Sequence, residues 1–533
     1  YSTPDCTGLP ILSSTTIGSR ATISMPSTAS SGGAPGVVAI TNVRVRDINV
    51  TGGASFTATG IDLGNNSGWT SISVGSPPKT LYWIGGNGEW TDVNHWTTNA
   101  DGTASGTGCI PTRFDNVVFN QFSGSGTFTV TNTSAVNSEC HDMTWTNGVV
   151  AGTRFTGNPV EISGSLRMAP GMIWNPSHVY FMSVDAGETI ETNNVNLASS
   201  NGGNGTIQFL GTGAWTFSDN FTTTSRILLY TGNLNTNAKN VTANTFNYPQ
   251  SGIPINTTAT LNISNSVIRV ANWSFNNTSI NTTNSHIYAN GRFHSANGVV
   301  YNNVTGFGSF TSSNTFNEVV LTGNTTMDGN NTFKKLTLTA NQYTLTLADN
   351  TTQTVQEELF INGTPCVNST VTASSSVANI NVLAGRTDFD FVNVKGINAS
   401  GLPLIFERNS VDNGGNTNIT FKTGPGGAIG LGADLTCHEI IAGDPASYTL
   451  SAAGFYGGIS TTYSWTKVGD PAHTGVLGTG STLDISTIGY GTYRVAVDYH
   501  GSIACLRTDD IIVSQKTAVP TAAATQKICN NSQ

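Results

Sequence analysis

The stretch Tyr82-Trp-Ile-Gly-Gly-Asn-Gly-Glu-Trp-Thr-Asp-Val-Asn-His-Trp96 holds three of the nine Trp residues of this 533-residue chain. It is followed by Cys109-Ile-Pro-Thr112 and by Asp115-Asn-Val-Val-Phe-Asn120. Elsewhere the aromatic residues are spread thinly among Asn, Thr, Ser and Gly. Because large apolar side chains fold into cores, such a cluster in a polar chain predicts the start of a folded module.

The composition favours an all-β chain. Only 10% of the residues are charged, whereas ordinary soluble domains are about 25% charged. Few Lys and Glu and many Thr, Val and Ile disfavour helices and favour strands joined by turns that contain Gly and Asn. The hydrophobic fraction of 37% is still enough to bury cores in a chain of this length.

The charge balance excludes some partners. The chain has 22 basic and 31 acidic residues, a net charge of −9 and no cluster of Lys or Arg, which argues against nucleic acid. No stretch approaches the roughly 18 to 20 apolar residues that span a bilayer, so we expect no membrane insertion. The first residues lack the pattern of a signal peptide, and we expect the chain to be either mature or cut from a longer one.

An internal repeat surrounds the Trp-rich stretch. Val392-Asn-Val-Lys-Gly-Ile-Asn-Ala-Ser-Gly401 resembles Val43-Arg-Val-Arg-Asp-Ile-Asn-Val-Thr-Gly52, which lies 349 positions earlier. Val411-Asp-Asn-Gly-Gly-Asn-Thr-Asn418 resembles Ile61-Asp-Leu-Gly-Asn-Asn-Ser-Gly68, 350 positions earlier. Two copies of one ending predict that residues 1–77 are the C-terminal coils of a preceding unit and that the chain is an excerpt.

The region between the two copies reads as a second unit. Its body, residues 151–425, is a series of short strand patterns in which Asn314-Thr-Phe316 recurs as Asn331-Thr-Phe333, a period of 17 residues. This period suits one coil of a solenoid whose strands stack on those of the coil below. We therefore predict a Trp-rich opening or cap at 78–150, followed by a parallel β-helix or β-solenoid.

The pattern changes again in residues 430–514. Cys437, Trp465 on a middle strand, a Gly-x-Tyr strand and Cys505 follow one another, with strand patterns about ten residues apart. This order predicts an Ig-like or PKD-like β-sandwich. Residues 515–533 are interpreted as a linker and the start of a further module.

The seven Cys residues show no metal-ligand spacing and indicate sparse disulfides in an exported protein. The predicted pairs are Cys437 with Cys505, which would frame the sandwich, and Cys109 with Cys140, which flank the opening strands. The sequence leaves open whether the remaining cysteines are free or paired: Cys6, Cys366 and Cys529.

No pattern marks catalytic, cofactor or metal chemistry. The eight His show no metal-ligand spacing, and no nucleophile elbow occurs. Asp388 and Asp390 could hold Ca²⁺ or act as acid and base. The corresponding positions of the first copy are Ala39 and Thr41, so the carboxylate pair is not a property of the module. We predict that the chain is not an enzyme and needs no cofactor or metal.

Trp83, Trp90 and Trp96 allow two interpretations. Exposed, they would form a platform on which sugar rings stack. Buried, they would pack a core or cap the open end of the solenoid, where an uncapped strand edge would lack hydrogen-bond partners. We favour the core or cap.

The motif of residues 82–96, with 109–112 and 115–120, resembles a module of very large surface proteins of Bacteroidetes, especially Flavobacteria. These include gliding-motility adhesins of the SprB type, exported by type IX secretion. The resemblance covers residues 78 to about 421 with the leading tail. It implies a location outside the cell, on its outer surface. It also implies polysaccharide or a solid substratum as partner, and the secretion and gliding machinery as partners of the full-length chain. It implies no catalytic residues.

We therefore predict a structural and adhesive segment of a giant extracellular adhesin, which serves as stalk and as a multivalent contact surface for attachment or gliding. The alternative is a β-helical carbohydrate-active enzyme or carbohydrate-binding module, which a cleft with three or more carboxylates would favour. A third hypothesis, an ice-binding protein, needs a regular Thr-x-Thr ladder. The Thr-x-Thr pairs of this chain are unevenly spaced.

Overall fold

A computed structural model describes most of the chain, in these ranges: residues 11–16, 18–28, 36–74, 78–104, 110–247, 259–276, 279–340, 342–364, 367–407, 410–422, 435–452, 462–498 and 506–515. These residues form strands, turns and short 3-10 segments with no α-helix, which confirms the predicted all-β class. The chain divides into two units. Unit 1 comprises residues 1–320 with 327–334, and unit 2 comprises 321–326 with 335–533.

Unit 1 begins with strands that pair in parallel. They form a sheet of order β1-β3-β5-β6 and a separate pair β2-β4. Their bounds are β1 (Ile11–Ser13), β2 (Ala21–Ser24), β3 (Val37–Arg46), β4 (Ile48–Thr51), β5 (Ser55–Asp62) and β6 (Ser71–Val74). Apolar residues at alternate positions, such as Val43 and Val45, point into a small core with Ile48 and Phe56.

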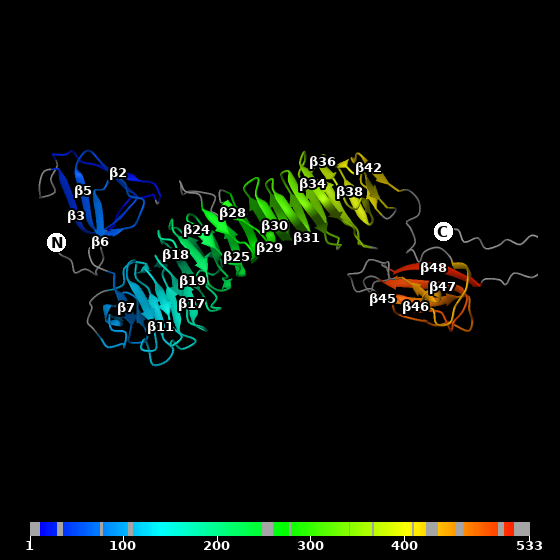
Figure 1. Cartoon of the computed structure of the whole chain (residues 1–533), viewed down its shortest axis with the longest axis horizontal. Coiled ribbons are helices and arrows are strands. Elements are labelled where there is room, and N and C mark those ends of the chain that lie inside the picture. Colours follow the sequence, from blue (N-terminus) through cyan, green and yellow to red (C-terminus); the bar gives the residue numbers. More distant parts are fainter. Residues whose placement is uncertain are drawn as a thin grey trace, which may run out of the picture. The chain divides into compact units, whose positions relative to one another are not determined.

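Sheets of stacked parallel strands follow in unit 1 (Figure 1). The first sheet contains β9 (Trp96–Thr97), β7 (Thr80–Trp83), β10 (Asn116–Phe119), β13 (Met143–Trp145), β16 (Leu166–Arg167), β19 (Glu188–Glu191), β21 (Ala214–Phe217), β24 (Asn233–Asn235), β26 (Thr260–Asn262) and β28 (Ser279–Asn281), in this order. The second contains β8 (Gly88–Glu89), β11 (Thr129–Asn132), β14 (Arg154–Gly157) and β17 (Ile173–Pro176). In the first sheet, β9 pairs antiparallel with β7 and forms the end of the sheet.

The third sheet begins at β12. Within unit 1 it contains β12 (Ser138–Cys140), β15 (Val160–Ile162), β18 (His178–Phe181), β20 (Thr206–Phe209), β22 (Phe221–Thr222), β23 (Arg226–Leu229), β25 (Val241–Asn247), β27 (Val267–Phe275), β29 (His286–Ser295) and β30 (Val300–Thr311). The strands β31 (Thr315–Met327) and β32 (Asn331–Leu338) contribute residues to both units.

The predicted 17-residue repeat is visible as contacts between neighbouring strands. The rings of Phe316 and Phe333 stack with their centroids 5.3 Å apart. The backbone amide of Asn314 donates a hydrogen bond of 3.0 Å to the side-chain oxygen of Asn331. Equivalent residues of successive passes of the chain therefore lie directly above one another, as parallel strands about 4.8 Å apart require.

Unit 2 continues the parallel pattern, for example between β33 and β35 and between β36 and β39. Its parallel strands are β33 (Thr344–Leu347), β34 (Thr352–Phe360), β35 (Ser369–Ala373), β36 (Ala378–Val382), β37 (Asp388–Phe389), β38 (Val392–Lys395), β39 (Ile397–Gly401), β40 (Leu404–Phe406), β41 (Val411–Asp412) and β42 (Ile419–Phe421).

The last strands of unit 2 differ, because antiparallel pairing dominates. They form a sheet β43-β48-β47-β45 and a pair β44-β46. Trp465 and Tyr493 are completely buried in their core. The bounds are β43 (Leu435–His438), β44 (Thr449–Ser451), β45 (Thr462–Val468), β46 (Thr482–Asp484), β47 (Gly491–Asp498) and β48 (Leu506–Gln515).

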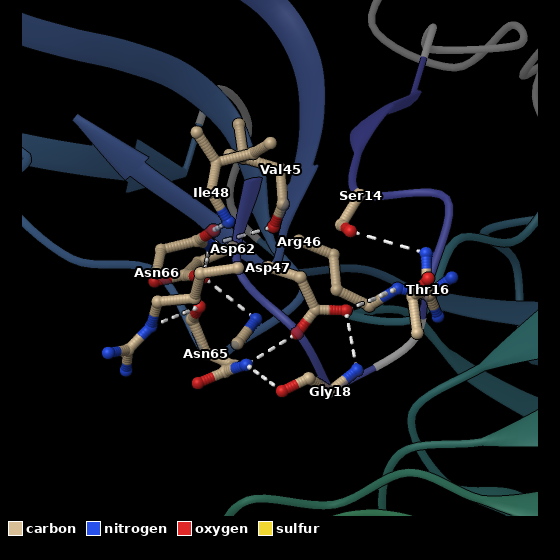
Figure 2. Close-up of polar contacts among 12 residues, drawn as sticks. Ser14, Thr16, Gly18, Val45, Arg46, Asp47, Ile48, Asp62, Asn65 and Asn66 are labelled. Atoms are coloured by element: carbon tan, nitrogen blue, oxygen red, sulfur yellow. Dashed lines mark hydrogen bonds and ion pairs between the residues drawn. The ribbon is translucent and has the colours of Figure 1, made fainter. Parts of the chain in front are cut away.

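One hydrogen-bond network occurs twice. In unit 1 the side-chain amide of Asn66 donates to Asp62 and to the backbone oxygen of Val45, and its oxygen accepts from the backbone amide of Ile48 (Figure 2). In unit 2 the corresponding residues make the same bonds: Asn416 with Asp412, Val394 and Ile397. The two copies seen in the sequence thus share their local structure, down to side-chain contacts.

Candidate functional site: a charged contact ahead of the Trp-rich segment

Trp83, Trp90 and Trp96 lie inside the core of unit 1, with exposed fractions of 0%, 1% and 1%. Trp96 meets Trp83 and Trp90 edge to face, with ring centroids 5.1 and 4.8 Å apart. The indole N–H of Trp96 donates to the backbone oxygen of Trp90, and that of Trp83 donates to Gly86. Because a sugar stacks only on an accessible ring face, these rings do not form a sugar platform.

The aromatic core extends from these Trp residues along the following strands. Phe119 stacks on Trp145 with ring centroids 3.6 Å apart, and Phe155 stacks on Trp174 at 4.9 Å. Trp96 belongs to β9, the antiparallel end strand of the first sheet. The Trp-rich segment therefore fills and closes the beginning of this core.

Asp115, the acidic residue at the start of the next motif, is also structural. Its carboxylate accepts hydrogen bonds from the backbone amides of Lys79 and Thr112, both at 2.9 Å, and from the Thr112 hydroxyl at 2.6 Å. Asp115 is 8% exposed. It thus fixes the start of β7 to the loop before β10, which explains an Asp at this position.

Cys140 is the cysteine whose side chain the structure describes. Cys140 is a buried free thiol whose sulfur faces the interior of the sheet, and burial raises its pKa well above the usual value. Its free state leaves the predicted pairing with Cys109 without support. Cys109 and Cys505 lie outside the described residues, as do Cys6, Cys366 and Cys529, and the side chain of Cys437 is not described.

A ladder of acidic side chains lies on the outer face of the third sheet at its first strand. Glu139 on β12 is the direct neighbour of Glu161 on β15, which in turn neighbours Tyr180 on β18. The residues on either side of Glu139 are buried, so the Glu side chains point outward. Like charges directly opposite each other on adjacent strands are destabilising. This end of the sheet therefore favours a cationic partner.

Arg44 of β3 supplies that cation. Its Nη1 lies 2.5 Å from Oε1 of Glu139, and the two side chains are only 16% and 18% exposed. Arg44 alternates with the buried Val43 and Val45, so it reaches out of the N-terminal strands toward β12. The pair therefore joins the strands that precede the Trp-rich segment to the first strand of the third sheet.

Arg113 adds a second cation from the loop before β10. It is 6% exposed, and its Nε has no hydrogen-bond partner among the described residues. Burial lowers its pKa, while the charges of Glu139, Glu161 and Asp62 raise it. Burial raises the pKa of Glu139, and so does the Glu161 charge, whereas Arg44 and Arg113 lower it. The two arginines offset much of the cost of burying the Glu139 carboxylate.

Behind this contact, a buried carboxylate holds the N-terminal strands in place. Asp47 lies between β3 and β4 with a left-handed backbone, φ 56°, and is 2% exposed. Its carboxylate accepts hydrogen bonds from the Gly18 amide at 3.0 Å and from the Asn65 side chain at 2.6 Å. Nε of Arg46 lies 3.8 Å from the same carboxylate, as Figure 2 shows. These contacts orient β3 and hence Arg44.

The two carboxylates considered for catalysis lie on and just beyond one short strand. Asp388 is on the short strand β37 and pairs with Arg386 at 3.3 Å, and Asp390 lies beyond the end of that strand. Within the part of the chain that the structure describes, no three His, Cys, Asp or Glu side chains gather in a way that could hold a metal ion.

Sequence reasoning missed the Arg44–Glu139 contact. Its signal was present in the first copy of the repeat, where Arg44 stands at the position of Asn393 in the second copy. In a chain with so few charges, an Arg confined to the copy that precedes a Trp-rich stretch indicates a role toward that stretch. Glu139 and Glu161 show no pattern in the sequence, because only strand pairing places them side by side.

No protein-family model, curated protein or solved structure matches this chain. Among the described residues, the structure has no helix with the length and apolar character needed to cross a membrane.

Proposed function

We propose that the chain is a structural and adhesive segment of a large extracellular surface adhesin of the SprB type. In this proposal the stacked parallel strands form β-solenoid units, and residues 430–514 form an Ig-like sandwich. The full-length chain would be exported by type IX secretion and would serve in attachment or gliding. No catalytic step is part of the proposal.

The observation that carries the proposal is the ion pair between Arg44 and Glu139. In a stalk built from repeated units, a contact between consecutive units limits their reorientation, whereas a bare flexible linker lets neighbouring units reorient freely. The charged contact joins β3 of the N-terminal strands to β12, the first strand of the third sheet. The duplicated Asn66 and Asn416 networks support a tandem arrangement of like units.

The surface composition supports adhesion by many weak contacts. Outward positions of the strands carry mainly Thr, Asn and Ser, which can donate and accept hydrogen bonds to hydroxyl-rich polymers. Single contacts of this kind are weak in water, and repetition along a long surface makes them additive through avidity. Polysaccharide or a hydrated solid surface is the partner that fits.

The proposal is tested in cells that lack the gene for the full-length chain. We expect loss of attachment or of surface movement, with unchanged degradation of external glycans. We also expect antibodies against this segment to label intact cells. Normal attachment and movement together with a lost glycan-degrading activity would contradict the proposal and favour the carbohydrate-active enzyme.

A further inference from the structure

One region of unit 1 has a charge opposite to that of the whole chain. Between Asn220 and Asn317 the sequence contains four basic residues and no Asp or Glu, although the chain as a whole has a net charge of −9. The basic residues are Arg226, Lys239, Arg269 and Arg292. The three arginines lie on β23, β27 and β29 of the third sheet, where the strand order is β23-β25-β27-β29.

These arginines share the outer face of the sheet. Arg269 alternates with the buried Ile268 and Val270, and Arg292 precedes the buried Phe293. Arg269 and Arg292 are exposed, and Arg226 is half-buried. Unlike Arg44, none of the three forms an ion pair recorded among the described residues. Among the residues that the structure describes, these three guanidinium groups are therefore not engaged in ion pairs.

Strand register sets the spacing of these charges. Arg226 is followed in its row by Thr245, then Asn272, then Arg292 on successive strands. Three strand steps of about 4.8 Å place the backbones of Arg226 and Arg292 roughly 14 Å apart along the stack. Arg269 lies on the intermediate strand β27 in a different register row, which pairs it with Thr242 and Tyr288. The arginines thus occupy two adjacent rows of one face, and a polymer with an acidic group on successive sugar residues presents anions at repeated positions across such a face.

An aromatic pair holds Arg269 in place. The guanidinium carbon of Arg269 lies 4.1 Å from the ring centroid of Tyr288, its register neighbour on β29. The rings of Tyr288 and His286 stack with centroids 4.2 Å apart, and His286 hydrogen-bonds to the hydroxyl of Thr305 on β30 at 2.8 Å. Stacking on Tyr288 restricts Arg269 while leaving its N–H groups available.

Two charged groups of opposite sign, Arg269 and Glu318, act on His286. Burial lowers the pKa of His286, and the Arg269 charge lowers it further, whereas the charge of Glu318 raises it. His286 is therefore neutral near pH 7 and acts through hydrogen bonds, so the positive charge of this surface comes from the arginines.

We propose that this arginine row, defined as Arg226, Arg269 and Arg292 on the outer face of the third sheet, binds an anionic polysaccharide. A guanidinium group pairs with a carboxylate or a sulfate through two parallel hydrogen bonds, so uronate and sulfated polymers share the chemistry. Neighbouring Thr and Asn side chains bind the sugar hydroxyls. The inference deepens the proposed adhesive function and rests on it for its biological role.

The test measures binding of the full chain to alginate, dextran sulfate and neutral dextran at low and high salt. The key variant replaces Arg226, Arg269 and Arg292 together by Ser. The matched control replaces Arg167, Lys335 and Arg386 by Ser. This removes the same charge from exposed positions outside the arginine row, each of which forms an ion pair with an Asp or Glu. We expect binding to the anionic polymers only, at least tenfold weaker in the key variant, little changed in the control and lost at high salt.

A second pair of variants tests the arrangement rather than the charge. Tyr288→Phe keeps the ring beneath Arg269 and should retain binding, whereas Tyr288→Ala should weaken it severalfold without changing net charge. The comparison of alginate with dextran sulfate shows whether carboxylate or sulfate is preferred.

Several results would overturn the arginine row. These are no binding of either anionic polymer, equal binding of neutral dextran, equal losses in the key and control variants, or tighter binding of duplex DNA or of anionic lipid vesicles through the same residues. If the key variant binds alginate normally while gene deletion abolishes attachment, the arginine row fails and the adhesin function stands. If the key variant loses alginate binding but gene deletion leaves attachment intact, the arginine row stands and the adhesin function fails.

Discussion

Arg44 and Glu139 lie 95 positions apart in the sequence, and their side chains form an ion pair of 2.5 Å between β3 and β12. Glu139 is also the register neighbour of Glu161, so the pair relieves a repulsion built into the sheet. In the second copy of the repeat, the residue at the Arg44 position is Asn393. The strands that follow the second copy, β43 to β48, pair mainly antiparallel. Arg44 thus serves the contact between β3 and β12, hereafter called the joint, and parallel strands of this kind form without it in the second copy.

Exchanging the two charges provides the first test. Arg44→Glu should destabilise the docking of the N-terminal strands by about 1 to 3 kcal/mol, because it removes a charged hydrogen bond and adds an anion to the acidic ladder. The double variant Arg44→Glu with Glu139→Arg should recover most of this loss. Native-state hydrogen exchange of β3 and β12 measures it.

The exposed pair Arg167–Glu191 serves as the control for this exchange, since its atoms are 3.2 Å apart but its side chains are 50% and 33% exposed. The same charge swap there should change stability by no more than about 1 kcal/mol. Equal effects at both pairs would mean that the joint adds nothing beyond an ordinary surface ion pair.

The joint should respond to pH through Glu139. Because burial raises the pKa of Glu139 above the usual value of 4.5, the folded chain takes up its proton more readily than the unfolded chain does. The resulting stabilisation is complete below the unfolded pKa and is lost as pH rises through the folded pKa. Urea unfolding of the wild type and of Glu139→Gln should therefore show a difference that favours the wild type increasingly as pH falls. A difference independent of pH would show that the carboxyl keeps its ordinary pKa.

The duplicated network allows a matched pair of substitutions. Asn66→Ala should leave the Ile48 amide and the Val45 oxygen without their side-chain partner and cost about 1 to 3 kcal/mol. Asn416→Ala should do the same at Ile397. Hydrogen exchange should accelerate at Ile48 only in the first variant and at Ile397 only in the second. Acceleration at neither amide would show that the side chain contributes little to local stability.

The Trp-rich segment should behave as core. Trp96→Ala should destabilise unit 1 by about 3 to 5 kcal/mol, because it leaves a cavity among Trp83, Trp90 and Phe119. Phe122→Ala, at a ring that is 48% exposed, should stay within about 1 kcal/mol. Thermal unfolding measures both. A Trp96→Ala variant of unchanged stability that had lost sugar binding would restore the platform interpretation.

Much of the fold was predictable because it follows local rules. Scarce Lys and Glu together with abundant Thr and Val indicated strands, and the recurrence of Asn314-Thr-Phe316 at residues 331–333 indicated that these strands stack there at a period of 17 residues. The structure shows that period in the stacked rings of Phe316 and Phe333. The favoured interpretation of Trp83, Trp90 and Trp96 as core also agrees with their burial, since large rings in a polar chain gain most from leaving water.

The candidate site was harder to predict, because its residues meet only through long-range pairing. Glu139 and Glu161 carry no sequence pattern, and their register comes from β12 and β15. The arginine row likewise joins residues that are far apart in sequence.

By itself, the sequence determined that the chain is all-β and that two similar stretches lie on either side of a Trp-rich segment. These features depend on residue propensity and on repetition, which are local properties of the chain. Only the tertiary structure decided that Arg44 meets Glu139 and that Arg226, Arg269 and Arg292 share one outer face. Paired parallel strands are joined by connections many residues long. Small differences in the length of each connection set the register and thereby decide which charged residues become neighbours.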